Sequence, residues 1–150
     1  MKKENTISRM IAIPVFILYL VLLAYLLFFS STYGRTAELG VRYNLVPFLE
    51  IRRGLEHIDT VGYHYVMVNI AGNIAAFMPF GFLLPFVTKR TVHFGKATAG
   101  TFLLSLSAEV IQLLSMTGAF DVDDLILNTV GGALGYVCYA ILFGRRRKKG

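Results

Sequence analysis

The sequence has few charged residues and almost no cysteine. Charged side chains make up 16% of its 150 residues, whereas a soluble globular domain carries about 25%. The single cysteine, Cys138, excludes an intramolecular disulfide and a cysteine-based metal site. The chain also lacks a P-loop, an H-E-x-x-H motif and a recognisable nucleophile motif, which are sequence signatures of nucleotide-binding and hydrolytic enzymes. This composition is not that of a soluble domain.

Apolar residues are in excess instead, at 55% of the chain. They fall in four runs of 19 to 23 residues with at most one charge each. A helix of that length, at about 1.5 Å per residue, crosses a hydrocarbon layer of ~30 Å. The sequence therefore predicts an all-α membrane protein, a single domain over residues 1–150 with four transmembrane helices. Their expected ranges are 11–29, 65–87, 97–115 and 125–143.

The first apolar run resembles a signal peptide only superficially. It is longer than the roughly 7–15 residues of a signal-peptide core, and no A-x-A cleavage site follows it. We therefore expect a retained helix that serves mainly as a lipid-facing anchor.

Basic residues are concentrated on one side of the predicted membrane. Eleven of the 15 lie before the first helix, between the second and third, or after the fourth. By the positive-inside rule, both termini are then expected in the cytoplasm. Because these charges sit at helix ends, they indicate topology and contact with membrane lipids, and no nucleic acid is expected as a partner.

The longest segment between helices, residues 30–64, lies on the outer side and is partly amphipathic. Its stretch RYNLVPFLEIRRGLEHI mixes apolar residues with arginines. Two placements are open for its apolar side chains. They can lie among lipid headgroups with the arginines at phosphate level, or pack on the helix ends. The apolar side chains concerned are Leu45, Phe48, Leu49 and Leu55.

Polar residues recur on one face of each of the last three helices. Asn69 and Asn73 are four residues apart on the second. On the third, Ser105, Glu109 and Gln112 share a face. The fourth begins with Asp123 and Asp124, either of which can cap its first turn, and continues with Asn128. At about 1.5 Å per residue, the three asparagines, Glu109 and Gln112 lie in the outer half of the membrane.

The third predicted helix contains one charged residue, Glu109, which is unexpected in a membrane span. An intramembrane carboxylate costs about 3 kcal/mol unless it is paired or solvated, so it is a functional candidate. We expect it to face the bundle and to hydrogen-bond with Asn69, Asn73, Gln112 or Asn128. Such a group suits acid–base catalysis or cation binding. The alternative is a structural hydrogen-bond network that joins the helices.

The aspartates also allow two interpretations. Asp121 is expected only to cap a helix or add solubility. For Asp123 and Asp124, capping and a functional role remain equally open. Adjacent aspartates are weak indicators of a metal, because a tight octahedral site usually needs further oxygen ligands. We therefore predict no metal site, and the sequence identifies no cofactor.

Several ordered motifs resemble the VanZ-like family. They are NLVPF at 44–48, N-x-x-x-F-x-P-x-G-x-L-L-P at 73–85, and E-x-x-Q at 109–112 followed by D-D-x-x-x-N-x-x-G-G-x-x-G at 123–135. The resemblance runs from about Tyr43 to Tyr136. It implies a protein of the bacterial plasma membrane and cell envelope, linked to resistance to the glycopeptide teicoplanin. On the matching positions, the polar motif residues are Asn73, Glu109, Gln112, Asp123, Asp124 and Asn128.

Three functions remain in competition. In the first, an outer-leaflet site binds a lipid-bearing molecule, either a lipoglycopeptide or a lipid-linked cell-wall precursor. In the second, a membrane enzyme modifies a lipid-linked substrate or a phospholipid. Glu109 would then be the acid–base group. Asp123 and Asp124 would hold a divalent cation or orient the substrate, and Arg42, Arg52 or Arg53 would hold phosphate. In the third, a homo-oligomer formed through the G-x-x-x-G face at 131–135 acts as a carrier.

Overall fold

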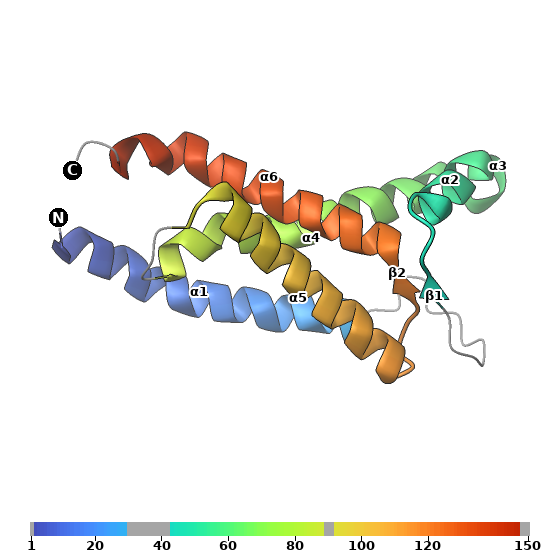
Figure 1. Ribbon diagram of the computed structural model, residues 1–150, viewed down its shortest axis with the longest axis horizontal. Helices are drawn as coiled ribbons and strands as arrows, with labels where there is room; N and C mark the ends of the chain where they lie inside the picture. Colours follow the sequence, from blue (N-terminus) through green and yellow to red (C-terminus); the bar gives the residue numbers. More distant parts are fainter. Residues whose placement is uncertain (1, 30–42, 89–91, 148–150) are drawn as a thin grey trace.

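The computed structural model describes residues 2–29, 43–88 and 92–147. Four long helices dominate it and form a bundle (Figure 1). Each is long and apolar enough to cross a membrane, so the prediction of an all-α membrane protein with four spans is confirmed. The four helices are α1 (Lys2–Phe29), α4 (Tyr63–Val87), α5 (Phe94–Leu114) and α6 (Val122–Arg147).

The helix bounds differ from the expected ranges mainly at the charged ends. The apolar part of the first helix begins at Arg9, but α1 already begins at Lys2. The apolar part of the fourth ends at Phe143, yet α6 continues to Arg147. Lysine and arginine are good helix formers, so the end of an apolar run need not end the helix.

The remaining described elements are short and lie at one end of the bundle. They are strand β1 (Tyr43–Asn44), helices α2 (Leu49–Glu56) and α3 (Ile58–Val61), and strand β2 (Phe120–Asp121). Figure 1 shows them at the end of the bundle away from both chain termini. The two strands pair in parallel, an element that hydrophobic periodicity did not predict because each strand has only two residues.

The core is the close packing of α6 on α4. A Cβ atom on Gly131 would lie 2.2 Å from the carbonyl oxygen of Ile74, and one on Gly135 only 1.9 Å from that of Met78. The two backbones therefore approach closely only because these positions have no side chain. The G-x-x-x-G face is thus occupied within the chain and is not free to pair with a second copy.

Helix α1 is held to α4 by polar contacts at two levels. The Tyr19 hydroxyl donates to the Ala76 carbonyl oxygen of α4 at 2.8 Å. The Arg9 Nε donates to the Val87 carbonyl oxygen at 3.2 Å, at the end of the bundle where the termini lie. Most apolar side chains on the rest of α1 are exposed, as expected for a helix that faces lipid.

Candidate functional site

The end of the bundle away from the termini contains a group of side chains that we call the carboxylate cluster. Its members are Asp121, Asp123, Asp124 and Glu109 with the amides of Asn44, Asn69 and Asn73. Its first member is Asp121 in β2, which pairs with Asn44 in β1. The Asn44 Nδ2 donates to the Asp121 Oδ1 at 3.0 Å, and the Asp123 backbone N–H donates to the same oxygen at 2.8 Å. Asp121 therefore caps α6, as expected of a helix-capping aspartate. The expectation that Asp123 or Asp124 caps this helix is wrong.

Asp123 holds a different helix. Its carboxylate accepts hydrogen bonds from the backbone N–H groups of Phe48, of Glu50 at 2.9 Å and of Ile51 at 3.1 Å. These groups lie at the start of α2, where the first N–H groups of a helix have no partner within the helix. Asp123 is only 1% exposed. Because both of its oxygens are engaged with backbone, we assign it to fixing α2 rather than to catalysis.

Asp124 joins the fourth span to the second. The Asn73 Nδ2 donates to the Asp124 Oδ1 at 2.6 Å and also contacts the Asn69 Oδ1 at 3.3 Å. Asn73 is buried, and Asn69 is half-buried one turn away on the same face. The structure thus brings together three of the predicted site residues.

Glu109 lies beside this group but has a partner that the sequence did not predict. It is 3% exposed, and its Oε2 accepts a hydrogen bond of 2.9 Å from the Asp121 backbone N–H. Among the described residues, no hydrogen bond joins Glu109 to Asn69, Asn73, Gln112 or Asn128, so that expectation is wrong. Glu109 is close enough to Asp121 and Asp124 for their charges to interact. Glu109 and Asp124 belong to the third and fourth candidate spans.

The other two predicted amides face elsewhere. Gln112 donates from Nε2 to the Leu27 carbonyl oxygen at 2.9 Å, so it ties α5 to α1 and does not join the cluster. Asn128 donates from Nδ2 to the Ser105 Oγ at 2.9 Å, deeper between α5 and α6. Its Oδ1 is buried without a partner among the described residues. Among the described residues, neither amide bonds to Glu109 or Asp124.

Asn44 and Asp121 are the participants that sequence reasoning underrated. Asn44 belonged to a quoted motif but was not assigned a role, and Asp121 was assigned only a capping role. A local signal existed for Asp121, since an aspartate two residues before a helical N–H is a typical N-cap. Its pairing with Asn44, 77 residues away, had no such signal.

The part of the chain that contains this site is similar to known proteins. A model of the VanZ/LLP1 family matches residues 16–143. The chain belongs to the VanZ-like family. Protein VanZ of Enterococcus faecium is 35% identical over 127 residues, which cover 83% of this chain and 70% of that protein. No solved structure matches the chain. The resemblance drawn from the sequence motifs is thereby confirmed.

The structure brings three of the quoted sequence motifs together. The 44–48 motif is far in sequence from the 123–135 motif, yet Asn44 bonds to Asp121 and Phe48 bonds to Asp123. The 73–85 motif joins through Asn73 and Asp124. The motifs therefore form one hydrogen-bonded assembly at one end of the bundle.

Two of the three arginines that were predicted to hold phosphate pair with glutamates on their own helix. The Arg52 Nε pairs with Glu56 at 2.6 Å, and the Arg53 Nη1 pairs with Glu50 at 2.6 Å. Both pairs lie within α2 and are largely exposed, so each charge is partly neutralised by a neighbour on the same helix. Arg42 lies outside the described residues. Over the part of the chain that the structure describes, no group of three or more His, Cys, Asp or Glu residues is arranged to hold a metal ion.

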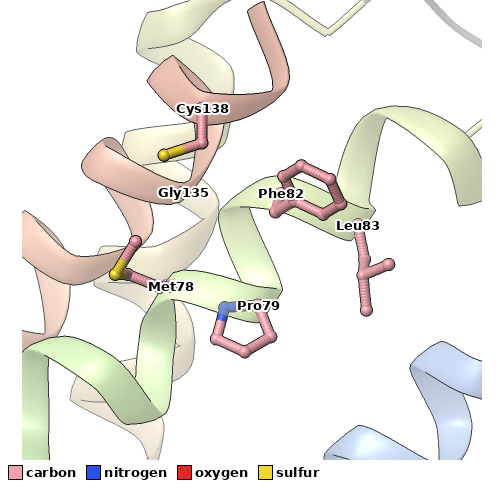
Figure 2. A pocket seen from close by; sticks show the side chains of 6 residues that line it. All are labelled: Met78, Pro79, Phe82, Leu83, Gly135 and Cys138. Carbon is pink, nitrogen blue, oxygen red and sulfur yellow. The ribbon is translucent and has the colours of Figure 1, made fainter. Parts of the chain in front are cut away.

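An apolar groove of about 310 Å³ opens between α4 and α6 (Figure 2). Gly135, one of its lining residues, follows Asp124 by eleven residues on α6, which is about 16 Å along the helix. The groove is therefore separate from the carboxylate cluster and lies within the second and fourth candidate spans. It is lined by Met78, Pro79, Phe82, Leu83, Gly135 and Cys138.

Asp121 makes the stability of the protein depend on pH. Partial burial raises the pKa of its carboxyl group, with the charges of Asp123 and Glu50 adding to the effect against the hydrogen bonds that it accepts. The folded state then binds the proton more tightly than the unfolded chain. Its contribution to stability is present in the protonated form and is lost as pH rises through the raised pKa.

We therefore expect wild type to gain stability relative to Asp121→Asn as pH falls from 7 towards the ordinary carboxyl pKa of 3.8. The asparagine keeps an oxygen that can accept from Asn44 and from the Asp123 N–H, but it cannot titrate. Thermal unfolding in detergent at a series of pH values measures the difference in Tm. Asp59→Asn, at an exposed site in α3, is the control. A difference in Tm that stays constant with pH would contradict the assignment.

Proposed function

We propose that this VanZ-like protein lies in a bacterial plasma membrane with both termini in the cytoplasm. Two observations support this orientation. Both termini lie at one end of the bundle (Figure 1), and Arg9 and Lys96 are basic residues near the span ends on that side. Basic residues are retained on the cytoplasmic side during insertion. The carboxylate cluster then lies in the outer leaflet.

The cluster is proposed to bind the polar head of a lipid-bearing molecule, whose lipid part stays in the bilayer. The observation that carries this proposal is the 2.6 Å contact of Asn73 with Asp124 beside the buried Glu109. Two carboxylates and two amides from three spans, held just below the membrane surface, offer acceptors and donors at the depth of lipid headgroups. Polar and ionisable side chains within membrane spans are costly, so a set of four indicates a function or a binding partner.

Two ligands suit this description. The VanZ-like resemblance implies a role against teicoplanin, a glycopeptide that carries an acyl chain. A lipid-linked cell-wall precursor has the same combination of a polar head and a lipid tail. In either case the proposed role is protection of the cell envelope by binding, and it requires no chemical step.

The test compares wild type, Glu109→Gln and Asp124→Asn in a bacterial host sensitive to teicoplanin. Each amide keeps an acceptor for the observed hydrogen bond and removes only the charge. Without the charge, the site loses a charge-assisted hydrogen bond to the proposed ligand. Such a bond contributes about 1.5–3 kcal/mol, so affinity for the ligand should fall roughly 10–100-fold. We expect teicoplanin protection to fall to the level of the host, with vancomycin susceptibility as the comparison.

Protein abundance is measured in parallel, and Asp59→Asn serves as the matched control because it removes an exposed carboxylate from α3. Protection that survives both changes at normal abundance would reduce the cluster to a structural network. Loss of protection together with loss of protein would also favour the structural role.

An enzyme acting on a lipid-linked substrate is the second candidate. The proximity of Glu109 and Asp124 favours it, because paired carboxylates in a shared site can act as acid and base. Purified protein incubated with lipid-linked precursor or phospholipid separates the two candidates. Formation of a product that Glu109→Gln abolishes while ligand still binds would replace pure binding by catalysis.

A further inference from the structure

Helix α2 is attached to the bundle at two span ends. Gly54 packs against Val66, where an added Cβ would lie 3.3 Å from a Val66 methyl carbon. Val66 is the first residue of the second candidate span. At the other attachment, Asp123 accepts from the Glu50 and Ile51 N–H groups and is the second residue of the fourth span. Two independent contacts therefore place α2 at the level where the outer ends of the spans meet the headgroup region.

The surface of α2 and of the turn before it is divided by polarity. On α2, Ile51 and Leu55 are one turn apart on one side, whereas the Arg52–Glu56 pair is one turn apart on another. The side chains that remain more than half exposed include four large apolar ones on this segment, Leu45, Val46, Phe48 and Leu55. In a water-exposed loop such a group would be costly, and in a headgroup region it is stabilising.

Phe48 has a backbone conformation that needs external support. Its φ is 65°, in the left-handed region that bulky residues rarely adopt. The Asp123 carboxylate binds its N–H and so holds it there. The outcome is an aromatic side chain that stays exposed at the start of α2. Because the strained Phe48 backbone leaves the aromatic ring exposed, it indicates that the ring contacts a surface outside the protein.

We infer that residues 45–55 dock on the outer leaflet of the protein's own membrane. Leu45, Val46, Phe48 and Leu55 enter the boundary between headgroups and acyl chains. The charged pairs of α2 stay at the level of phosphate and water. Two further large apolar side chains, Tyr63 and Met67, are exposed near the start of α4.

The docked segment also determines what the carboxylate cluster faces. Asn44 and Phe48 are bonded to Asp121 and Asp123, the neighbours of Asp124. Docking therefore holds the cluster beside lipid headgroups rather than beneath bulk water. This inference concerns the membrane itself as the partner, so it stands or falls independently of the ligand proposed above.

The test places single reporter cysteines in a Cys138→Ala background. Leu45→Cys and Leu55→Cys label the proposed lipid-facing side. Glu56→Cys and Asp59→Cys label exposed charged sites as controls. Phe48 is left unchanged because its backbone lies in the left-handed region, where a substitution could alter the fold of the segment. The proteins are reconstituted in phospholipid vesicles and labelled with an environment-sensitive fluorophore.

Docking predicts that the labels at Leu45 and Leu55 are quenched by a nitroxide attached to lipid and protected from iodide in the buffer. The control labels should show the opposite pattern. Labels at both test sites that are as accessible to iodide as the control at Asp59 would overturn the inference. Protection from iodide that disappears when the protein is diluted with excess lipid would also overturn it, because a second copy would then be the partner. Two test sites are used so that one poorly folded variant does not decide the result.

Discussion

Replacing Gly135 with alanine is expected to lower the Tm of the detergent-solubilised protein by about 6–12 °C. The added Cβ would lie 1.9 Å from the Met78 carbonyl oxygen and 2.8 Å from the carbonyl carbon, both in the backbone of α4. A flexible side chain could move away, but a helix backbone cannot do so without separating α4 from α6. The cost is near the upper end of that for overpacking, about 3 kcal/mol.

Gly95→Ala is the matched control. Gly95 lies in the exposed first turn of α5, and an added Cβ there would be 3.5 Å from the nearest atom, in the His93 ring. Alanine is also a better helix former than glycine. The control should leave the Tm unchanged or slightly higher. Equal shifts in the two variants would show that the α4–α6 contact is looser than the structure indicates.

Replacing Asp123 with alanine is expected to release α2 while the four spans remain folded. Three backbone N–H groups at the start of α2 would lose a charged acceptor. Hydrogen bonds to charged groups contribute about 1.5–3 kcal/mol, so amide exchange in α2 should quicken by roughly 10–100-fold. Hydrogen–deuterium exchange with mass spectrometry measures this on a peptide that covers residues 45–56.

Two comparisons make the result specific. Peptides from α4 should keep their exchange rates, because Asp123 makes its observed bonds to α2. Asp59→Ala, which removes an exposed aspartate from α3, should change neither region. If α2 exchanges at the wild-type rate in Asp123→Ala, the carboxylate does not hold the helix and its role as a functional acid would reopen.

Helical spacing predicted the faces of the spans better than it predicted their partners. It placed Asn69 with Asn73 on one face, and both belong to the cluster in the structure. It also grouped Glu109 with Gln112, yet Gln112 faces α1 and bonds to Leu27. Residues three apart differ by about 60° around a helix axis, which is enough for them to contact different neighbours in a four-helix bundle.

The sequence could not predict the hydrogen-bond donors to the aspartates, for a different reason. Asp123 could be recognised as a capping residue, because aspartates near a helix start usually cap that helix. It caps α2 instead, with donors 72 to 75 residues away along the chain. No local pattern specifies a donor at such a separation.

The sequence by itself determined the number of spans, their approximate ends and membership of the VanZ-like family. These follow from the length of apolar runs, the helical period and the order of motifs, which are all local along the chain. Only the tertiary structure decided that Asp123 holds α2, that Asp121 joins Asn44 to α6 and that Glu109 bonds to the backbone at Asp121. A carboxylate accepts from whichever donor the packed elements bring near, and here the donors come from α2, β1 and β2, which no local pattern links to these carboxylates.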